Sequence, residues 1–360
     1  MKKNKIVFFT ESMSVMGGME RVVDFLSVEL SDKYDVHILT MNGSIGADFK
    51  TNAKIDTLGI DIIPDSLLNK IQRYYKTIIE LKKYLMTLDN DSYFVANSPA
   101  LCCSVMIVKT IYKISAKVIL FEHNKFTFPG KFWQIVRKLT YNKAHRVIAL
   151  TSDVHNKYLE LGFPSVCIPN ALTVSIGNTS KLEHKKVIAV GRLVYQKGFD
   201  LLLLAWKDVI RIHPDWVLEI VGDGPERSEL IKISNELKIS NNVIFYGETY
   251  DVQSRYSDAS LFVLSSRYEG FGLVLVEALA HGLPCISFNC ESGPNEIIKN
   301  NYNGFLVEPE SVTLLTDYVN KYIQLTMDEK LKLSSNSLSS ITKFKPENII
   351  NKWKEEVFND

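Results

Sequence analysis

Two glutamates separated by seven residues, Glu269 and Glu277, carry the most informative chemistry of this chain. Between them, Gly270 and Gly272 allow a tight turn, and Leu273–Ala280 consists of strong helix formers. The N-terminus of a helix presents unpaired N–H groups and a partial positive charge, both of which suit an anion. The segment therefore predicts an anion site with a carboxylate on each side of it.

The ligand expected at this turn combines phosphates with hydroxyls. A nucleotide diphosphate can rest on the backbone of Phe271, Gly272 and Leu273. The carboxylates of Glu269 and Glu277 can accept hydrogen bonds from sugar hydroxyls. For either glutamate alone, a solvated helix face or a loop charge is the simpler interpretation. The apolar residues around Glu277 instead predict a buried helix, in which a carboxylate needs a partner. Together these features indicate a nucleotide sugar.

Two cations lie on another predicted loop. The predicted strand Lys186–Val190 runs into segment 191–198, which holds Arg192 and Lys197. Arginine offers a planar fork of donors and lysine a point charge, so the two residues suit a diphosphate. A solvated loop with two unrelated charges is the alternative.

Glycines follow two further predicted strands. Gly17 and Gly18 follow the predicted strand Lys5–Thr10. Gly222 and Gly224 begin the loop after the predicted strand Trp216–Val221. Paired glycines let the backbone approach a ligand, and the second loop can offer amides to a base or a ribose. A plain turn is the simpler interpretation of each loop alone. Neither loop has the Gly-x-Gly-x-x-Gly fingerprint, which counts against a dinucleotide-dependent oxidoreductase.

His123 directly follows the predicted strand Lys117–Glu122. Ligands of parallel α/β sheets bind at the carboxyl ends of the strands. We therefore expect His123 at the edge of the site, with a packed or surface histidine as an equal alternative.

Composition limits the class of protein. A net charge of +1 gives no reason to expect nucleic acid binding, and 46% hydrophobic residues allow two domains with large cores. Five cysteines without metal-ligand spacing fit a reducing cytosol. We expect no signal peptide, no membrane span and no bound metal. Residues 1–172 carry 22 Lys and Arg against 16 Asp and Glu, so this half can face an anionic membrane surface.

Short β-rich runs alternate with helical patterns, which predicts an α/β protein with parallel sheets covered on both faces. The predicted strands are Lys5–Thr10, Val36–Thr40, Tyr93–Asn97, Lys117–Glu122, Arg146–Thr151, Lys186–Val190, Trp216–Val221, Asn242–Tyr246, Leu261–Leu264 and Pro284–Phe288. The predicted helices include Met19–Leu30, Leu67–Met86, Lys131–Tyr141, Phe199–Ile212, Arg227–Leu237, Leu273–His281 and Leu314–Leu325.

We expect two Rossmann-like domains, at residues 1–170 and 171–345, facing a central cleft that holds the site. The polar segment Ala171–Lys185 has the composition of a linker. Residues 346–360 are expected to form a helix that crosses back to the first domain.

The ordered motifs resemble those of glycosyltransferase family 4, which has the GT-B fold. The most specific matches are the segment from Glu269 to Glu277 and the loop that holds Arg192 and Lys197. The resemblance extends from residue 17 to about residue 307. It implies a retaining, metal-independent transfer from a nucleotide diphosphate sugar, with no further cofactor. Supporting matches are Gly17-Gly18-Met19-Glu20-Arg21, Gly222-Asp223-Gly224-Pro225, Gly293-Pro294-Asn295-Glu296-Ile297-Ile298 and Asn303-Gly304-Phe305-Leu306-Val307.

By position, the resemblance implies a role for each matched residue. Arg192 and Lys197 would hold the diphosphate and stabilise the leaving group. Glu277 would accept from the ribose hydroxyls, Glu269 would contact hydroxyls of the donor sugar, and His123 would lie near the reacting sugar. The donor-binding residues are completed by those of the turns: Gly17, Gly18, Gly222, Gly224, Phe271, Gly272 and Leu273.

Two segments indicate a membrane-linked acceptor. Leu67–Met86 has the pattern of a basic amphipathic helix, and segment 125–133 mixes aromatic residues with lysines beside His123. An ordinary sheet-covering helix and a packed loop are the alternatives. The motif variants most resemble bacterial enzymes that build capsule, O-antigen or exopolysaccharide repeats. That resemblance implies a saccharide on polyprenyl diphosphate as acceptor, and a cytoplasmic enzyme peripheral to the inner face of the plasma membrane.

The sequence leaves more than one donor sugar and more than one class of reaction open. UDP-linked galactose, glucose or their N-acetylamino forms are preferred, and GDP-mannose, for a mannosyltransferase, is the runner-up. A UDP-sugar 2-epimerase of the same fold and a non-catalytic nucleotide-sugar-binding subunit are the competing functions. The subunit is disfavoured because a degenerate enzyme has no chemical reason to keep Arg192, Lys197, Glu269 and Glu277. Linkage and oligomeric state do not follow from the sequence.

Overall fold

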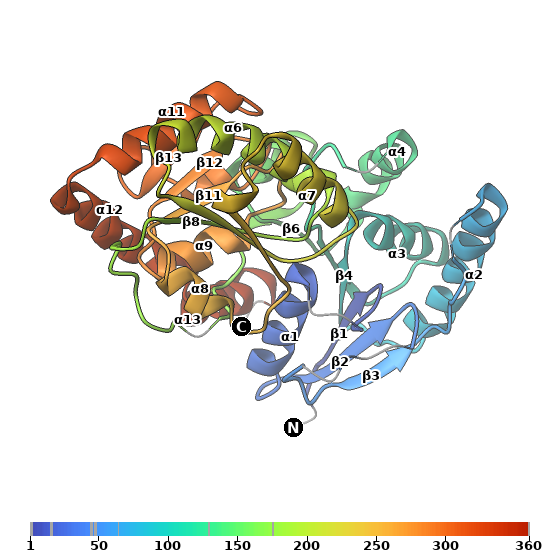
Figure 1. The fold of residues 1–360 in the computed structure, drawn as a ribbon. Helices are drawn as coiled ribbons and strands as arrows, with labels where there is room; N and C mark the ends of the chain where they lie inside the picture. Colours follow the sequence, from blue (N-terminus) through green and yellow to red (C-terminus); the bar gives the residue numbers. More distant parts are fainter. Residues whose placement is uncertain are drawn as a thin grey trace. The chain divides into compact units, whose positions relative to one another are not determined.

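The chain divides into two compact units, each with its own sheet and core (Figure 1). The computed structural model describes residues 3–14, 17–43, 46, 49–63, 65–128, 130–174 and 176–358. Unit 1 comprises Met1–Thr173 together with Pro346–Asp360, and unit 2 comprises Val174–Lys345.

Unit 1 is built on a seven-stranded parallel sheet with the order β3-β2-β1-β4-β5-β6-β7. Its strands are β1 (Lys5–Thr10), β2 (Asp35–Thr40), β3 (Lys54–Thr57), β4 (Tyr93–Asn97), β5 (Lys117–Phe121), β6 (Arg146–Ala149) and β7 (Ser165–Cys167). Its helices include α1 (Gly18–Leu30), α2 (Leu67–Leu85), α3 (Pro99–Tyr112), α4 (Lys131–Thr140) and α5 (Ser152–Glu160). The central strands β1, β4 and β5 are mostly apolar, as expected where helices cover both faces of a parallel sheet.

Alternate residues of the unit 1 strands point to opposite faces of the sheet. Val7, Phe9 and Phe94 face a core made with α2, α3 and α5. Tyr93 and Phe121 point to the other face, where the last helical segment of the chain covers them.

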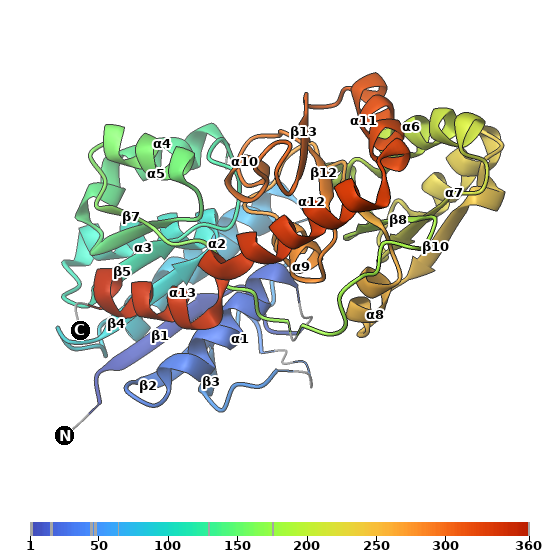
Figure 2. The ribbon, with the colours of Figure 1, turned by 90° about the vertical axis from the view of Figure 1, so that its left-hand side faces the viewer.

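That segment consists of α13 (Pro346–Lys352) and a π-helical turn (Trp353–Val357), and it lies across unit 1 (Figure 2). The Tyr93 hydroxyl donates to the carbonyl of Phe358 at 2.8 Å. The rings of Phe121 and Trp353 lie 5.2 Å apart, centroid to centroid. The C-terminal residues therefore belong to the core of the unit that is synthesised first.

Unit 2 has a six-stranded sheet with the order β10-β9-β8-β11-β12-β13, and its strand pairs are parallel. Its strands are β8 (Lys186–Val190), β9 (Val217–Val221), β10 (Val243–Gly247), β11 (Leu261–Leu264), β12 (Cys285–Phe288) and β13 (Gly304–Val307). Its helices are α6 (Phe199–Ile212), α7 (Arg227–Glu236), α8 (Val252–Ser257), α9 (Leu273–Ala280), α10 (Pro294–Ile297), α11 (Val312–Gln324) and α12 (Met327–Ser340). Side chains of α6, α7 and α11 form the core on one face of this sheet.

The predicted strands and helices are present, and their ends differ from the predicted ones by at most two residues. The strands β3, β7 and β13 were not predicted. All three are edge strands of three or four residues, and β3 and β7 are only partly buried, so neither an apolar run nor a long alternation marks them. The helix after Pro225 begins at Arg227, as predicted.

The predicted linker contributes its last residues to unit 2. The N–H of Ser180 donates to the carbonyl of His281 at 2.8 Å, and its hydroxyl donates to the carbonyl of Ala259. Leu182 is buried. The change from one unit to the other therefore falls early in Ala171–Lys185, between Thr173 and Val174.

Candidate active site

The strand order of unit 2 reverses between β8 and β11. β8 and β11 are neighbours in the sheet. The chain continues from β8 to β9 on one side of this pair and from β11 to β12 on the other side. Ligands of doubly wound sheets bind in the crevice at such a switch point. The predicted anion site falls here, because segment 191–198 follows β8 and segment 265–272 follows β11.

Hydrogen bonds to main-chain carbonyls join these two loops. The N–H of Arg267 donates to the carbonyl of Gln196 at 2.8 Å. The Gln196 side-chain amide donates to the carbonyl of Tyr268 at 3.0 Å, and the Ser265 hydroxyl donates to the carbonyl of Lys197 at 3.0 Å. The backbone that carries Lys197 is thus held by the loop that leads into α9.

Arg267 clamps the same junction with its side chain. Its guanidinium donates two hydrogen bonds to the carboxylate of Asp200, at 2.9 and 2.6 Å, and lies 3.9 Å from the ring centroid of Tyr195. The Nε atom of Arg267 also lies 3.3 Å from the carboxylate of Glu310. The hydrogen bonds to Asp200 raise the pKa of Arg267 above its usual value. A Cβ on Gly198 would lie 2.1 Å from a backbone oxygen of the other loop, so this junction requires glycine.

The junction brings Lys197 and Glu269 into a direct ion pair. Their charged atoms lie 2.6 Å apart, and the Ser266 hydroxyl donates to the same carboxylate at 2.6 Å. The side chains are 18% and 7% exposed, respectively. The stem of Lys197 crosses Gly191, where a Cβ would lie 3.4 Å from its methylenes. Arg192, the next residue, is exposed. The Lys197 side chain thus reaches back across the start of the loop, where Arg192 follows Gly191.

Glu277 lies inside α9 and is almost completely buried, as its apolar neighbours predicted. Its carboxylate accepts a hydrogen bond from the Tyr256 hydroxyl at 3.1 Å. The Nδ1 atom of His281 lies 2.8 Å from the Glu277 carbonyl and fixes the following turn. Glu277 thus has the protein partner that burial requires.

The N-terminus of α9 carries no side-chain cap. Its N-cap residue, Gly272, has a φ of 95°, a conformation that glycine adopts most readily. Leu273 is the first residue of the helix. Phe271 is buried, and its carbonyl lies 2.1 Å from where a Cβ on Gly293 would stand. The turn is therefore fixed by close backbone packing, and its N-cap residue, a glycine, has no side chain with which to cap the positive end of the helix dipole.

Gly222 and Gly224 allow two loops to pack tightly. A Cβ on Gly222 would lie 2.1 Å from the carbonyl of Gly191, and one on Gly224 would lie 2.4 Å from that of Leu193. The Gly222 amide donates to Gly247, and the Gly224 amide donates to the preceding carboxylate at 2.6 Å. Both amides that were expected to receive a base or ribose thus already have partners within the chain.

His123 follows β5 in unit 1 and lies against Asn97 at the end of β4. The Asn97 amide nitrogen donates to the carbonyl of Phe9, so its oxygen faces His123 Nε2 at 3.2 Å. His123 is therefore protonated on Nε2, which leaves a lone pair on Nδ1. Burial lowers the pKa of His123 to about 3. The residue is a neutral imidazole at physiological pH.

The Gly17–Gly18 turn lies at the same edge of the unit 1 sheet, because it follows β1, next to β4. Gly18 begins α1. A Cβ on Gly17 would lie 2.6 Å from the carboxylate of Glu20, which turns back over the first turn of the helix. Burial raises the pKa of Glu20. The start of α1, where the glycines were expected to let the backbone approach a ligand, thus has an acidic side chain beside it.

A buried ion pair holds the loop that starts with His123. The carboxylate of Glu122 accepts from Arg137 at 2.6 Å and from the hydroxyls of two tyrosines, Tyr141 and Tyr158. Arg137 also donates to the carbonyls of Phe126 and Phe128 at 2.7 and 3.0 Å. Although burial opposes the charge, Glu122 keeps the pKa of Arg137 above its usual value. Sequence reasoning had given neither residue a role.

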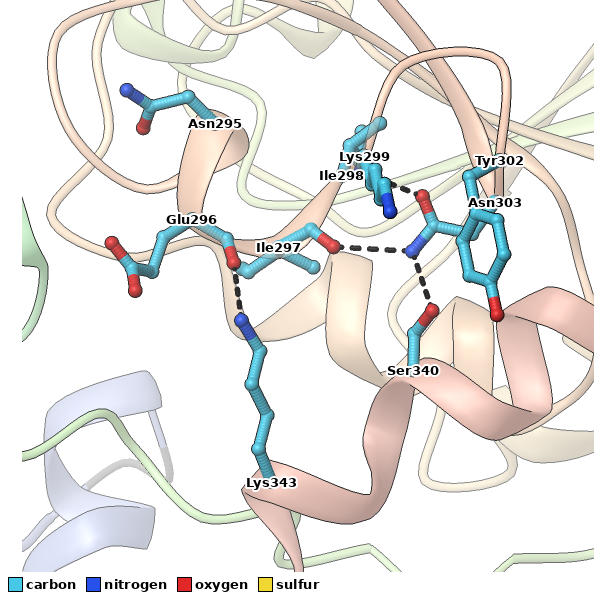
Figure 3. Close-up of a pocket in the computed structure, with 9 residues that line it drawn as sticks. All are labelled: Asn295, Glu296, Ile297, Ile298, Lys299, Tyr302, Asn303, Ser340 and Lys343. Atoms are coloured by element: carbon cyan, nitrogen blue, oxygen red, sulfur yellow. Dashed lines mark hydrogen bonds between the residues drawn. The ribbon is translucent and has the colours of Figure 1, made fainter.

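A hollow of about 510 Å³ lies beside α10 and α12 in unit 2 (Figure 3). The Asn303 side chain accepts from Lys299 N–H and donates to Ile297 and Ser340, and Lys343 donates to the carbonyl of Glu296. These contacts tie the chain around β13 to α12. The predicted site residues do not line this hollow, and its residues serve to join segments of the fold.

Three residues of the site were missed in the sequence. Asn97 stands at the end of a predicted strand, so the rule that singled out His123 also applies to it. Arg267 stands two residues before Glu269, inside the most informative segment. Tyr256 gives no comparable signal, because its contact with α9 arises only in the folded chain. Among the described residues, no cluster of three or more His, Cys, Asp or Glu is arranged to hold a metal.

Comparison with known proteins gives two family matches in succession. The sequence model "Glycosyltransferase Family 4" matches residues 16–175, and "Glycosyl transferases group 1" matches residues 175–338. An uncharacterised glycosyltransferase of Haemophilus influenzae is 30% identical over 97% of this chain and 99% of its own length. The amylovoran biosynthesis glycosyltransferase AmsD of Erwinia amylovora is 28% identical, with 98% and 99% covered. The lipopolysaccharide 1,6-galactosyltransferase of Salmonella typhimurium is 25% identical, with 89% of each covered.

Solved structures show the same architecture. S. aureus TarM, crystallised with α-GlcNAc-glycerol and UDP, matches with a TM-score of 0.81 and 18% identity, covering 99% of this chain and 100% of its own. The expected pair of parallel-sheet, Rossmann-like domains is confirmed.

Proposed function

Because this chain belongs to the family 4 glycosyltransferases, with a group 1 domain following the family 4 domain, we propose that it transfers a sugar from a nucleotide diphosphate sugar with retention of anomeric configuration. The membership itself makes the chain a glycosyltransferase of the GT-B fold, as the motifs predicted. The stereochemistry, the donor and the acceptor are the parts that we propose.

The observation that carries the proposal is the Lys197–Glu269 pair, in which Glu269 precedes the glycine-capped N-terminus of α9 by only a few residues on the same loop. In the transfer, the bond between the anomeric carbon and the diphosphate oxygen breaks, and its electron pair stays on the diphosphate. Lys197, Arg192 and the helix end supply positive charge where this negative charge develops. The acceptor hydroxyl bonds to the anomeric carbon from the same face, and its proton passes to the leaving oxygen.

The carboxylates have a different role from those of a glycosidase. Glu269 is already neutralised by Lys197 and is suited to accept hydrogen bonds from sugar hydroxyls once the donor draws the ammonium towards phosphate. Glu277 would accept from the ribose, sharing its carboxylate with Tyr256. In this proposal neither glutamate acts as a nucleophile, because a same-face transfer does not need one.

His123 contributes an acceptor atom instead of a proton. Since its Nε2–H is engaged by Asn97 and the ring is neutral, its Nδ1 lone pair is suited to a sugar hydroxyl. We assign His123 to orientation of the reacting sugar.

We propose a UDP-sugar as donor, of galactose, glucose or their N-acetylamino forms, and a polyprenyl-diphosphate-linked saccharide as acceptor. The UDP bound to TarM supports the nucleotide, and the name of the lipopolysaccharide galactosyltransferase supports a role in surface polysaccharide synthesis. The enzyme would act peripherally at the inner face of the plasma membrane. No helix of the described residues has the length and apolarity to cross a bilayer.

The test is nucleoside diphosphate release from a panel of UDP- and GDP-sugars, in EDTA, with and without a lipid extract of the source cells. Release that requires one UDP-sugar and the lipid, with an anomeric product matching the donor by NMR, is the expected result. Inversion refutes retention, and GDP-mannose use refutes UDP. Interconversion of a UDP-sugar without acceptor would identify a 2-epimerase.

A further inference from the structure

Helix α4 of unit 1 exposes a row of apolar side chains, although Trp133 and Val136 on its inner side pack against the core. Its most buried residues are the polar Arg137 and Thr140. Phe132, Ile135 and Leu139, spaced by three and four residues on one face, are 64%, 60% and 67% exposed. A helix that only covered a sheet would not expose this second apolar face. The inward position of Arg137 is explained by Glu122 and by the loop carbonyls that it holds.

The first half of α2 shows a similar face. The buried residues of this helix begin only at Thr77. Before it, Leu67, Leu68, Ile71 and Tyr75 are 75%, 64%, 57% and 70% exposed. These residues recur at about four-residue spacing and so share a side of the helix.

The two exposed faces adjoin. α2 and α4 both pack against α3 (Figure 1), and the rings of Tyr74 and Trp133 are in edge contact at 5.0 Å. We call the combined surface the α2–α4 face, defined by Leu67, Leu68, Ile71, Tyr75, Phe132, Ile135 and Leu139. So many large apolar side chains gathered on adjoining helices mark an interaction site.

The charges around the α2–α4 face indicate which kind of partner it binds. Segments 66–86 and 125–143 together carry ten Lys and Arg and one acidic residue, Glu80. Lys70, Lys131 and Lys138 are exposed beside the apolar side chains. Aliphatic and aromatic side chains bordered by lysines are the pattern of helices that lie in a membrane interface, where the lysines meet anionic headgroups.

We propose that the α2–α4 face docks unit 1 onto a bilayer that contains anionic lipid. The inference rests on the lipid-linked acceptor proposed above and identifies the surface that reaches it. Docking also has a consequence within unit 1, because α4 and the His123 loop are joined by Arg137. The outer side of α4 meets lipid while its inner side positions the loop that carries His123.

The test is flotation of the full chain with vesicles of phosphatidylethanolamine and phosphatidylglycerol, compared with vesicles of phosphatidylcholine alone. The combined variant Ile71→Gln, Ile135→Gln, Leu139→Gln should lower partition onto the anionic vesicles by at least about tenfold. The matched control, Ile212→Gln with Leu331→Gln, removes unit 2 residues that are 58% and 48% exposed and should leave partition unchanged. Lys131→Glu with Lys138→Glu should weaken binding mainly at low salt.

Unchanged partition of the triple variant, or equal binding of the native chain to both kinds of vesicle, overturns the proposal. A native chain that dimerises through this face and ignores vesicles, with the triple variant monomeric in sedimentation velocity, overturns it in favour of a second copy as partner. Sugar transfer to detergent-dispersed lipid extract is measured separately. Transfer without vesicle docking refutes this inference alone, and docking without transfer refutes the proposed function alone.

Discussion

The Lys197–Glu269 pair contributes both to stability and to catalysis. The two contributions can be separated by substitution. Lys197→Met keeps the stem that crosses Gly191 but removes the ammonium. Glu269 then remains as a buried carboxylate, 7% exposed, with only the Ser266 hydroxyl bonded to its side chain among the described contacts. Removing one partner of a fully buried pair costs about 3–5 kcal/mol, and the partial exposure of Lys197 reduces our expectation to about 2–3 kcal/mol.

Adding Glu269→Gln to Lys197→Met removes the stranded charge. An amide is cheaper to bury than a carboxylate, so the double variant should recover at least half of the lost stability in urea unfolding at pH 7. Glu269→Gln alone should cost less than Lys197→Met, because the lysine side chain is 18% exposed and its ammonium can turn to water.

Turnover should not follow stability. Loss of a preorganised charge at a developing anion lowers turnover by roughly 100- to 1,000-fold. UDP release by both Lys197→Met and the double variant should therefore stay low, although the double variant folds well. The reasoning is refuted if the double variant regains most of its activity, or if Lys197→Met keeps turnover within about threefold of the native chain. Isothermal titration with UDP would show that each variant still has its nucleotide site.

Other features give sharp expectations. Arg267→Ala should raise KM for the donor about tenfold or more by loosening the loop that carries Lys197, whereas Arg211→Ala, which breaks an exposed pair, should leave kinetics unchanged. Gly222→Ala should lower the free energy of unfolding in urea by about 2 kcal/mol or more, because its Cβ would stand 2.1 Å from a carbonyl. At Gly130 a Cβ has no contact within 4 Å among the described residues, so Gly130→Ala should change stability little. Because burial lowers the pKa of His123 to about 3 from 6.5, the stability that the neutral ring contributes is complete above pH 6.5 and declines as pH falls from there toward 3. Between pH 7 and pH 5 the native chain should lose about 1–2 kcal/mol more than His123→Asn; equal losses would show that the ring is not desolvated.

Much of the architecture was predictable because it depends on short-range patterns. The apolar runs of β1, β4 and β8 and the helix formers of α9 mark their elements locally, and the apolar neighbours of Glu277 correctly predicted its burial. The edge strands β3 and β7 are short and partly exposed, so their pairing depends on the neighbouring strand.

The contacts of the candidate site were not predictable in the same way. Lys197 and Glu269 were each selected for a ligand, but their mutual pairing joins positions 72 residues apart and follows from the strand order of unit 2. The clamp of Arg267 on Asp200 spans 67 residues. Helix α4 was predicted as a helix, but the exposure of its Phe132, Ile135 and Leu139 was not. Which side of α4 faces outward depends on the pairing of Arg137 with Glu122, a residue that sequence reasoning treated as the end of a strand.

The return of the last helix to unit 1 has a consequence for biosynthesis. Tyr93 and Phe121 emerge from the ribosome early, yet their cover, Trp353 and Phe358, follows only after all of Val174–Lys345 has been made. At about 5–20 residues per second, synthesis of that intervening stretch takes roughly 10–35 s. During this interval the nascent sheet presents an uncovered aromatic face, while unit 2 can complete its core without waiting for later residues. The half of the chain that is translated first is therefore the half that finishes folding last, and the interval is one in which a chaperone has a defined surface to protect.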